Sequence, residues 1–462
     1  MMHKRKGMTR AFTTTLKAST LFYLLHLVTG PSLAAQTPSR LIDISKTAKM
    51  NPAKRHLIIC LDGVGFSIIQ KMYEKGEFCV FKPPARLIAP FPTLTNPGVI
   101  EILGPIGAPE ARGYEDYYYD PTSDQMCGGF FARFRRKTFI DGTFRALFDF
   151  HPSPITMTLE YAAPPVSPWI DARLTLMKVR DKFERSKAST FIAYIGSTDP
   201  LAHVGGEWLL RSFLGVLDKT CEEIIEQSNG QVDISVFSDH GNHFTRYRKV
   251  DLVPELKRLG FRLDDGLKDE RSVVQPRYGL VGCAVLYSGE AYKQQIAVAA
   301  ARTAGVDLAA YKQGDIVYLV ARSGRARIEH RNGFYWYSAD MGDPLRLLPI
   351  LAELEKRGCI RNDGFIADAD LFTATHHHVY PDAVRRLWEG LTNHVVHPAS
   401  VLVSFEDGYY DGSTLLDILA VLRATHGNLR RGQTEAILMT TKRELPDAVR
   451  AGDVWSALSS DK

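Results

Sequence analysis

Short apolar runs recur along the chain from residue 56 onward and are separated by longer stretches of mixed polarity. Three runs have the length and composition of buried strands: Leu57–Leu61, Thr190–Ile195 and Val232–Phe237. The stretch 206–229 has the apolar periodicity of an amphipathic helix and lies between the second and third runs. Strands that alternate with helices are typical of a layered α/β fold with a largely parallel sheet, which we predict here.

The same patterns divide the chain into segments. The N-terminal 34 residues have the pattern of an export signal, and a polar linker follows; the pattern after residue 244 becomes mixed and returns to core-like alternation near residue 401. The later part contains two further predicted strands, Val401–Val403 and Ile437–Met439, and a predicted helix at 413–423. We therefore predict the following organisation: signal peptide 1–34, linker 35–55, first part of a catalytic core 56–244, inserted cap region 245–400, and C-terminal part of the core 401–462.

Composition restricts the class of protein. The chain has 462 residues, of which 45% are hydrophobic and 24% charged, so a disordered, collagen-like or coiled-coil protein is excluded. No apolar stretch of roughly 20 residues occurs, which argues against a multi-span membrane protein. The net charge of +5 equals the number of lysines and arginines in residues 1–34, where no acidic residue occurs. The chain from Ala35 onward is neutral, so we expect no nucleic-acid-binding surface.

The N-terminus has the three parts of a signal peptide. A basic stretch with Lys4, Arg5 and Lys6 precedes an apolar run at 21–28, and small residues at 32–35 offer a cleavage site. This pattern predicts an exported protein, periplasmic or secreted; an uncleaved membrane anchor or a transit peptide is the alternative. Six cysteines allow up to three disulfides in an exported protein, although Cys60 lies in an apolar run and is expected to be a buried thiol.

Acidic residues follow each of the three predicted strands. Asp62 comes directly after the first strand, Asp199 follows the second, and Asp239 follows the third. Each one alone has a structural explanation, because aspartate is common in turns and caps helices. The carboxyl ends of parallel strands meet at one edge of a sheet, however, and ligands bind at that edge. Histidines accompany these acids at His203, His240 and His426.

Three carboxylates and three imidazoles suit a pair of divalent metal ions. Carboxylate and imidazole are ligands of zinc, or of manganese where oxygen dominates. Asp199 and His203 are four residues apart, which places both on one side of a helical turn. Two ions a few ångströms apart stabilise the attacking and leaving oxygens of a phosphoryl displacement.

The segment 91–98 supplies a nucleophile. Pro97 is expected near the start of a helix, so that Thr95 or Asn96 occupies the N-cap. A hydroxyl at that place lies beside free backbone N–H groups that favour a bound phosphate. A threonine activated by a metal is a competent nucleophile, and Thr95 is our candidate.

Five motifs in order carry a resemblance to a known family. They are D-G at 62–63, P-T-x-T-x-P at 92–97, D-P-x-x-H at 199–203, S-D-H-G at 238–241 and H-G at 426–427. The series resembles the alkaline phosphatase superfamily and, within it, the nucleotide pyrophosphatase/phosphodiesterase (type I phosphodiesterase) group. The resemblance covers residues 56–244 and 400–445. It implies an α/β/α sandwich around a mostly parallel sheet, with an inserted cap.

The resemblance also implies roles for the individual residues. Asp199, His203 and His426 would hold one zinc; Asp62, Asp239 and His240 would hold the other. Thr95 would lie between the two ions, contact them and form a covalent phospho-enzyme with a small-molecule phosphate ester. Gly98 stands where the phosphodiesterase group has an asparagine, so the donor to the phosphate oxygen would be Asn96, the backbone amides of 95–96, or a side chain from the loop 112–130.

Several other functions remain open or are disfavoured. A phosphomonoesterase, a phosphonate hydrolase or a phosphotransferase could use the same scaffold, and a metal-binding relic without turnover is the alternative outside enzymes. The chain has no P-loop, H-E-x-x-H, G-x-S-x-G or sulfatase motif, and the G-x-G at 63–65 lacks the third glycine of a dinucleotide site.

The run His376–His378 is expected at the surface, with a further metal site as the alternative. The run Tyr117–Tyr119 is either a stacking platform or a packed loop, and the basic cluster 133–137 is expected to be a solvated face.

Overall fold

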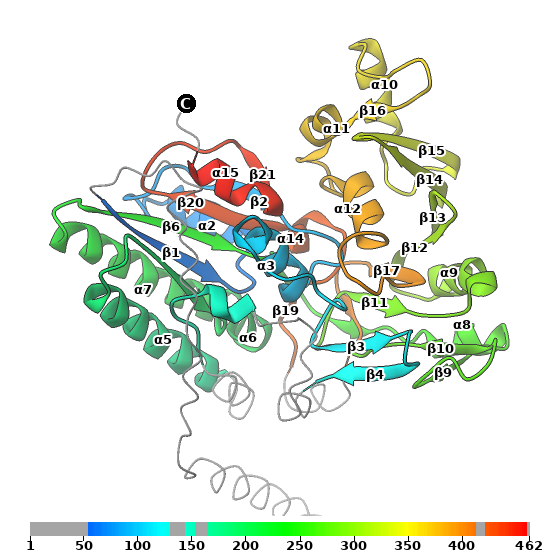
Figure 1. Ribbon diagram of the computed structural model, residues 1–462, viewed down its shortest axis with the longest axis horizontal. Helices are drawn as coiled ribbons and strands as arrows, with labels where there is room; N and C mark the ends of the chain where they lie inside the picture. Colours follow the sequence, from blue (N-terminus) through cyan, green and yellow to red (C-terminus); the bar gives the residue numbers. More distant parts are fainter. Residues whose placement is uncertain (1–53, 130–143, 153–164, 413–420, 460–462) are drawn as a thin grey trace, which may run out of the picture. The chain divides into compact units, whose positions relative to one another are not determined.

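The computed structural model describes residues 54–129, 144–152, 165–412 and 421–459 (Figure 1). A six-stranded central sheet has the strand order β21-β2-β20-β6-β1-β5. Its strands are β1 (Arg55–Leu61), β2 (Ala85–Ile88), β5 (Thr190–Ile195), β6 (Val232–Ser238), β20 (Glu435–Thr440) and β21 (Ala448–Arg450). Only β20 runs against its neighbours in this sheet. The mostly parallel α/β fold predicted from the sequence is therefore confirmed.

Helices cover both faces of the central sheet. Side chains alternate along β1, so that Leu57 and Ile59 pack into one apolar cluster and Ile58 and Cys60 into another. The first cluster contains buried residues of α2 (Phe66–Tyr73), α5 (Val166–Arg185) and α7 (Gly206–Gln227). The second contains buried residues of α3 (Thr95–Leu103), α12 (Ala383–Gly390) and α15 (Val454–Ser459). The helix predicted at 206–229 is α7.

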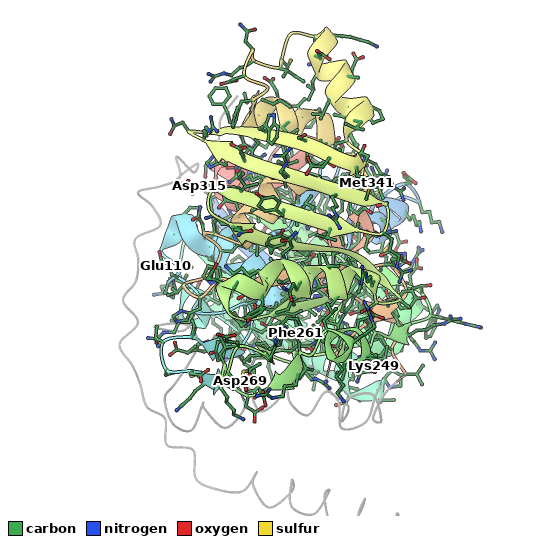
Figure 2. The ribbon with its side chains drawn as sticks, turned by 90° about the vertical axis from the view of Figure 1, so that its right-hand side faces the viewer. Glu110, Lys249, Phe261, Asp269, Asp315 and Met341 are labelled. Atoms are coloured by element: carbon green, nitrogen blue, oxygen red, sulfur yellow. The ribbon has the colours of Figure 1, made fainter. Side chains whose placement is uncertain are left out.

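A seven-stranded antiparallel sheet occupies much of the later chain, in the order β11-β17-β12-β13-β14-β15-β16. Its strands are β11 (Cys283–Leu286), β12 (Val306–Gln313), β13 (Ile316–Ala321), β14 (Gly324–Arg331), β15 (Phe334–Gly342), β16 (Ile366–Ala367) and β17 (Val401–Phe405). Figure 2 shows this second sheet, with Asp315 and Met341 at opposite ends of its strands. Helices α8 (Val253–Arg258) and α9 (Lys293–Arg302) share an apolar cluster with β12 and β17.

The strand predicted at Val401–Val403 exists, but it belongs to the second sheet. Strand β17 pairs antiparallel with β11 and with β12. All five of its residues are buried. A strand that is buried on both faces is a continuous apolar run in either sheet, so the sequence alone does not show which sheet contains it. The expected division at residue 400 therefore falls within a sheet.

Smaller elements complete the described chain. They are β3 (Tyr117–Asp120), β4 (Gln125–Gly128), α6 (Thr198–Pro200), a π-helical turn (Leu201–Gly205), β7 (His243–Phe244), β8 (Arg248–Lys249), β9 (Arg262–Asp264), β10 (Ser272–Val274), α10 (Leu348–Lys356), α11 (Asp368–Thr375), β18 (Tyr409–Tyr410), β19 (Ala424–Thr425) and α14 (Arg431–Thr434), with short 3₁₀ turns between them. Within the hairpin of β3 and β4, Tyr118 and Tyr119 are buried, and the Tyr119 ring lies 5.0 Å from that of Tyr287. Tyr118 and Tyr119 are therefore packed, whereas Tyr117 is exposed.

Some predicted features lie outside the described residues. They are the signal peptide 1–34, nearly all of the linker 35–55, the basic cluster 133–137 and most of the helix predicted at 413–423. Among the helices of the described segments, none is long and apolar enough to cross a membrane. All six cysteines fall within these segments and are free thiols, with Cys60 buried as predicted.

Candidate active site

The topology brings the acidic and histidine side chains to one edge of the central sheet. Leu61 at the end of β1 lies opposite Ile195 on β5 and Ser238 on β6, so the residues that follow these strands start at the same level. Strand β20 runs the other way and enters at this edge, which brings the chain after β19 close to the three strand ends. The structure brings together the seven side chains that the sequence assigned to the metals and the nucleophile: Asp62, Thr95, Asp199, His203, Asp239, His240 and His426.

The first cluster consists of Asp199, His203 and His426. Asp199 lies in α6, and His203 lies in the π-helical turn that follows it. Asp199 Oδ1 is 3.2 Å from His203 Nε2 and 3.8 Å from His426 Nε2. The Nδ1 atom of His426 is 2.8 Å from the carbonyl oxygen of Thr93, which leaves Nε2 facing Asp199. A backbone carbonyl behind a ligating imidazole is the usual way of orienting it toward a metal.

The second cluster lies beside the first and contains Asp62, Asp239 and His240. His240 Nε2 is 3.4 Å from Asp62 Oδ1 and 3.6 Å from Asp239 Oδ2. Ligand atoms of Asp62, His240 and Asp199 all lie within 4.8 Å of one another. Asp199 therefore stands between the two clusters.

Thr95 lies against the second cluster. Its hydroxyl is 3.3 Å from Asp62 Oδ1 and 3.2 Å from His240 Nε2. The expectation that Thr95 or Asn96 caps the helix is wrong, because Leu94 is the N-cap and α3 begins at Thr95. Leu94 cannot cap with its side chain, so the first backbone N–H groups of α3 keep their capacity to bind an anion beside the Thr95 hydroxyl.

The structure distinguishes the three candidate donors to a phosphate oxygen. Asn96 Nδ2 donates to Glu115 Oε2 at 2.7 Å, so this amide is already engaged. The loop 112–130 contributes Glu115, an acid, at this place. A Cβ on Gly98 would lie 2.7 Å from the backbone oxygen of Asp239, so no side chain fits there without moving Asp239. The backbone N–H groups of Thr95 and Asn96 lie at the start of α3, beside the Thr95 hydroxyl.

Charges in the site shift several pKa values. Burial raises the pKa of Asp239 to about 8, with the nearby Asp62 adding to the effect against the opposing charge of His240. Burial would lower the pKa of His240, but Asp239 and Asp62 raise it to about 10. Burial and the charge of His240 lower the pKa of His426 to about 3. Burial opposes ionisation of Asp199, yet the imidazoles of His203 and His426 hold its pKa below the usual value.

These residues fit bound divalent cations. Among the described residues, His203 Nε2 and Asp239 Oδ2 are buried atoms without a hydrogen-bond partner. Leaving such atoms unpaired, and three carboxylates close together, costs free energy unless a cation neutralises and coordinates them. Aspartate oxygens and neutral imidazole nitrogens are donors that zinc accepts. The donor set and its unpaired atoms could therefore hold metal ions.

Sequence reasoning missed residues that hold the ligands in place. Tyr194 on β5 donates its hydroxyl to Asp62 Oδ2 at 2.5 Å. Asn242 donates to Asp199 Oδ1 and to the carbonyl of Gly63, both at 2.9 Å. Asn242 is two residues after His240, so its place in the S-D-H-G-N stretch was the available signal. Tyr194 lies inside an apolar run and gave none.

A cavity of about 150 Å³ opens onto the first cluster and Thr95. Its polar wall contains Thr95, Asp199, His203 and His426, together with Glu115. The remaining lining residues are mostly apolar: Val204, Tyr278, Gly279, Leu280, Val281 and Leu422.

Comparison with known proteins agrees with this fold. The structure of phosphonoacetate hydrolase from Sinorhizobium meliloti 1021 in complex with phosphonoformate matches with a TM-score of 0.50 and 13% identity, covering 88% of this chain and 96% of the other. Human ectonucleotide pyrophosphatase/phosphodiesterase 5 matches with a TM-score of 0.45 and 12% identity, covering 88% and 94%. No family profile and no curated protein matches the sequence. The alkaline phosphatase-like α/β fold implied by the motifs is thus confirmed by the first of these structures.

Proposed function

We propose that this protein is an exported hydrolase of phosphoric esters that uses two divalent metal ions and a threonine nucleophile. The observation that carries the proposal is the Thr95 hydroxyl, which lies at the N-terminus of α3 and within 3.3 Å of Asp62 Oδ1 and His240 Nε2. A nucleophile, a metal centre and an anion-binding helix end at one place are the parts that phosphoryl transfer requires.

The metal ions are assigned to the two clusters. Asp199, His203 and His426 would hold one ion, and Asp62, Asp239 and His240 the other, with Thr95 able to contact it. We assign zinc because three of the six ligands are imidazoles, and manganese is the alternative. When bound, these ions would lower the pKa of the Thr95 hydroxyl and neutralise charge on the phosphate oxygens.

The remaining chemistry belongs to residues of this chain. Thr95 Oγ1 loses its proton and forms a bond to phosphorus while the ester bond to the leaving group breaks, which gives a phosphothreonine and, with that proton, the free alcohol. The backbone amides at the start of α3 bind a non-bridging oxygen, whose charge increases in the transition state. Water then attacks the phosphothreonine, releases the phosphoryl group and restores the Thr95 hydroxyl. Leu280 and Val281 also line the cavity and would reduce contact between a bound ester and bulk water.

Two observations narrow the class of substrate. The cavity volume of about 150 Å³ fits a small phosphate ester beside Thr95. A diesterase resembling nucleotide pyrophosphatases is the first candidate, on the order of the sequence motifs. A phosphonate hydrolase is the second candidate, because phosphonoacetate hydrolase shares the fold across 96% of its own length.

Hydrolysis of a nitrophenyl phosphate diester, a nitrophenyl phosphate monoester and phosphonoacetate by zinc-loaded protein tests the proposal, with nitrophenol released from the first two and phosphate from the third. Thr95→Ala should lower kcat/KM on the preferred compound by at least about 10³-fold, since removal of a nucleophile has effects of this order or larger. Thr95→Ser, which keeps a hydroxyl, is the matched control and should retain measurable turnover. Turnover that persists in Thr95→Ala would overturn the nucleophile assignment, and zinc binding without turnover on any compound would favour the relic.

A further inference from the structure

A second group of possible metal ligands lies outside the active-site motifs. His376 and His377 follow α11, and Asp447 directly precedes β21. Asp447 Oδ2 is 2.6 Å from His377 Nε2 and 3.5 Å from His376 Nε2, and the three side chains offer ligand atoms that lie within 4.8 Å of one another. The third histidine of the run turns elsewhere, because His378 Nδ1 accepts a hydrogen bond from the Tyr380 amide at 3.2 Å.

Contacts behind these side chains fix the atoms that face one another. Arg86 Nη1 donates to Asp447 Oδ1 at 2.6 Å, which leaves Oδ2 for the imidazoles. His376 Nδ1 is 3.2 Å from the carbonyl oxygen of Phe372. A carbonyl can only accept, so the hydrogen sits on Nδ1, and the Nε2 of a neutral His376 presents a lone pair to a carboxylate oxygen. Two acceptors that face each other favour a cation between them.

We propose that His376, His377 and Asp447 bind one Zn²⁺ ion, with water completing its coordination. Zinc–ligand bonds of about 2.0–2.2 Å in a tetrahedral arrangement place neighbouring ligand atoms roughly 3.3 Å apart. The His376–Asp447 distance of 3.5 Å already matches. The shorter His377–Asp447 contact opens by a small rotation of His377, which is about half exposed. The Phe372 carbonyl and Arg86 act as the supports that ligating residues commonly have.

This site joins two parts of the fold. Helix α11 follows β16 at the edge of the second sheet, whereas Asp447 belongs to the edge of the central sheet. The same junction is already held by Arg450 of β21, which pairs with Asp368 at the start of α11 at 2.5 and 2.9 Å. A zinc ion at the other end of α11 fixes this helix to the central sheet at both ends. Its role is structural and does not depend on the proposed hydrolysis.

Zinc content per chain tests the site directly. Full-length protein, His377→Ala and His378→Ala are equilibrated with micromolar free Zn²⁺ and washed, and bound zinc is then measured by mass spectrometry of the metal. His377→Ala should bind one zinc fewer per chain than the wild type, whereas His378→Ala, the matched control, should bind the same number. Hydrolysis of the nitrophenyl substrate should be unchanged in both variants, which separates this site from the active site.

A second measurement links the ion to the junction. Zinc should raise the Tm of the wild type by about 3 °C more than that of His377→Ala, because a ligand that binds only the folded state stabilises it. His376→Gln should repeat the loss of one ion by removing a different ligand. Equal zinc content in wild type, His377→Ala and His376→Gln would overturn the proposal, and so would binding of the additional ion only at millimolar zinc.

Discussion

Both ends of the central strands bury polar side chains, but the two ends differ in how completely these side chains are hydrogen-bonded. At the amino end, His56 Nε2 lies 2.7 Å from Ser235 Oγ, which donates to Thr440 Oγ1 at 2.8 Å. At the carboxyl end, His203 Nε2 and Asp239 Oδ2 are buried without a hydrogen bond, although each lies within 4 Å of an oppositely charged or ionisable group, Asp199 and His240 respectively. The first arrangement satisfies its polar groups and ties β1, β6 and β20 together. The second arrangement leaves a carboxylate oxygen and an imidazole nitrogen as possible metal ligands. An unpaired buried atom alone does not mark such a site, since Asp218 Oδ1 is also unpaired; the clustering of carboxylates and imidazoles does.

Among substitutions that distinguish the two ends of the strands, Asp239→Asn should have the largest effect on activity. The amide keeps an oxygen for the N–H groups of Gly63 and His240, which Asp239 Oδ1 now accepts at 3.0 Å each. It removes one negative charge from the metal centre, so kcat/KM on a nitrophenyl substrate should fall by at least about 10²-fold. Unfolding in urea with EDTA at pH 7 should show a variant that is more stable by about 1 kcal/mol, because the free-energy cost that raises the pKa of Asp239 in the folded state is absent from it.

Asp218→Asn is the matched control for this prediction. Asp218 is also buried and has an oxygen without a hydrogen-bond partner, but it lies on α7 away from the cavity-lining residues. Its substitution should leave kcat/KM unchanged. If Asp239→Asn lost no activity, or if Asp218→Asn lost as much, the metal role of Asp239 would be wrong.

Gly98→Ala should have a smaller effect on the same side chain. The new Cβ would lie 2.7 Å from the Asp239 carbonyl oxygen and 3.1 Å from its Cβ, so α3 and Asp239 must separate. Displacing a ligand and the nucleophile relative to each other should lower kcat/KM about tenfold. Gly104→Ala, at the end of the same helix with no atom within 4 Å of the added Cβ, should retain full activity. Equal activity of both variants would show that the close packing of Gly98 is not important for catalysis.

The smallest effect is expected from His56→Gln at the amino end of the strands, where the substitution should change the pH dependence of stability. Burial, assisted by Lys442, lowers the pKa of His56 to about 3, whereas an unfolded histidine titrates near 6.5. Between pH 3 and pH 6.5 only the unfolded state binds a proton at His56. The neutral, buried His56 therefore makes its full contribution to the free energy of unfolding above pH 6.5, and this contribution is lost as the pH falls toward 3. The wild type should lose about 1 kcal/mol per pH unit more than His56→Gln in urea unfolding between pH 6 and 4. Equal pH slopes, or lost activity in His56→Gln, would contradict a purely structural role.

Some of this contrast could be predicted from the sequence. The acids after the strands ending at Leu61, Ile195 and Phe237 were predictable, because apolar runs fix the strand ends and parallel strands share an edge. The Asn96–Glu115 contact and the packing of Gly98 on Asp239 were not, since they depend on how α3 and a loop sit on the sheet. The same holds for β17, whose apolar run fits either sheet.

The pair His376–His377 shows a similar limit. Consecutive side chains usually point in different directions along a helix or strand, so the sequence favoured a surface role. The run does lie in a turn at the surface, with His377 about half exposed, but the same turn also brings both imidazoles to Asp447, a residue 70 positions after His377 in the chain. Only tertiary structure places that acid beside them.

The most direct test of the central claim is the position of the ions at the carboxyl end of the sheet. Crystals of the protein grown with Zn²⁺ would be measured at the zinc absorption edge, and an anomalous difference map would locate each ion. The account predicts one peak among Asp199, His203 and His426 and another among Asp62, Asp239 and His240, with Thr95 Oγ1 facing the second. An active protein whose map showed no peak at these six side chains would contradict it.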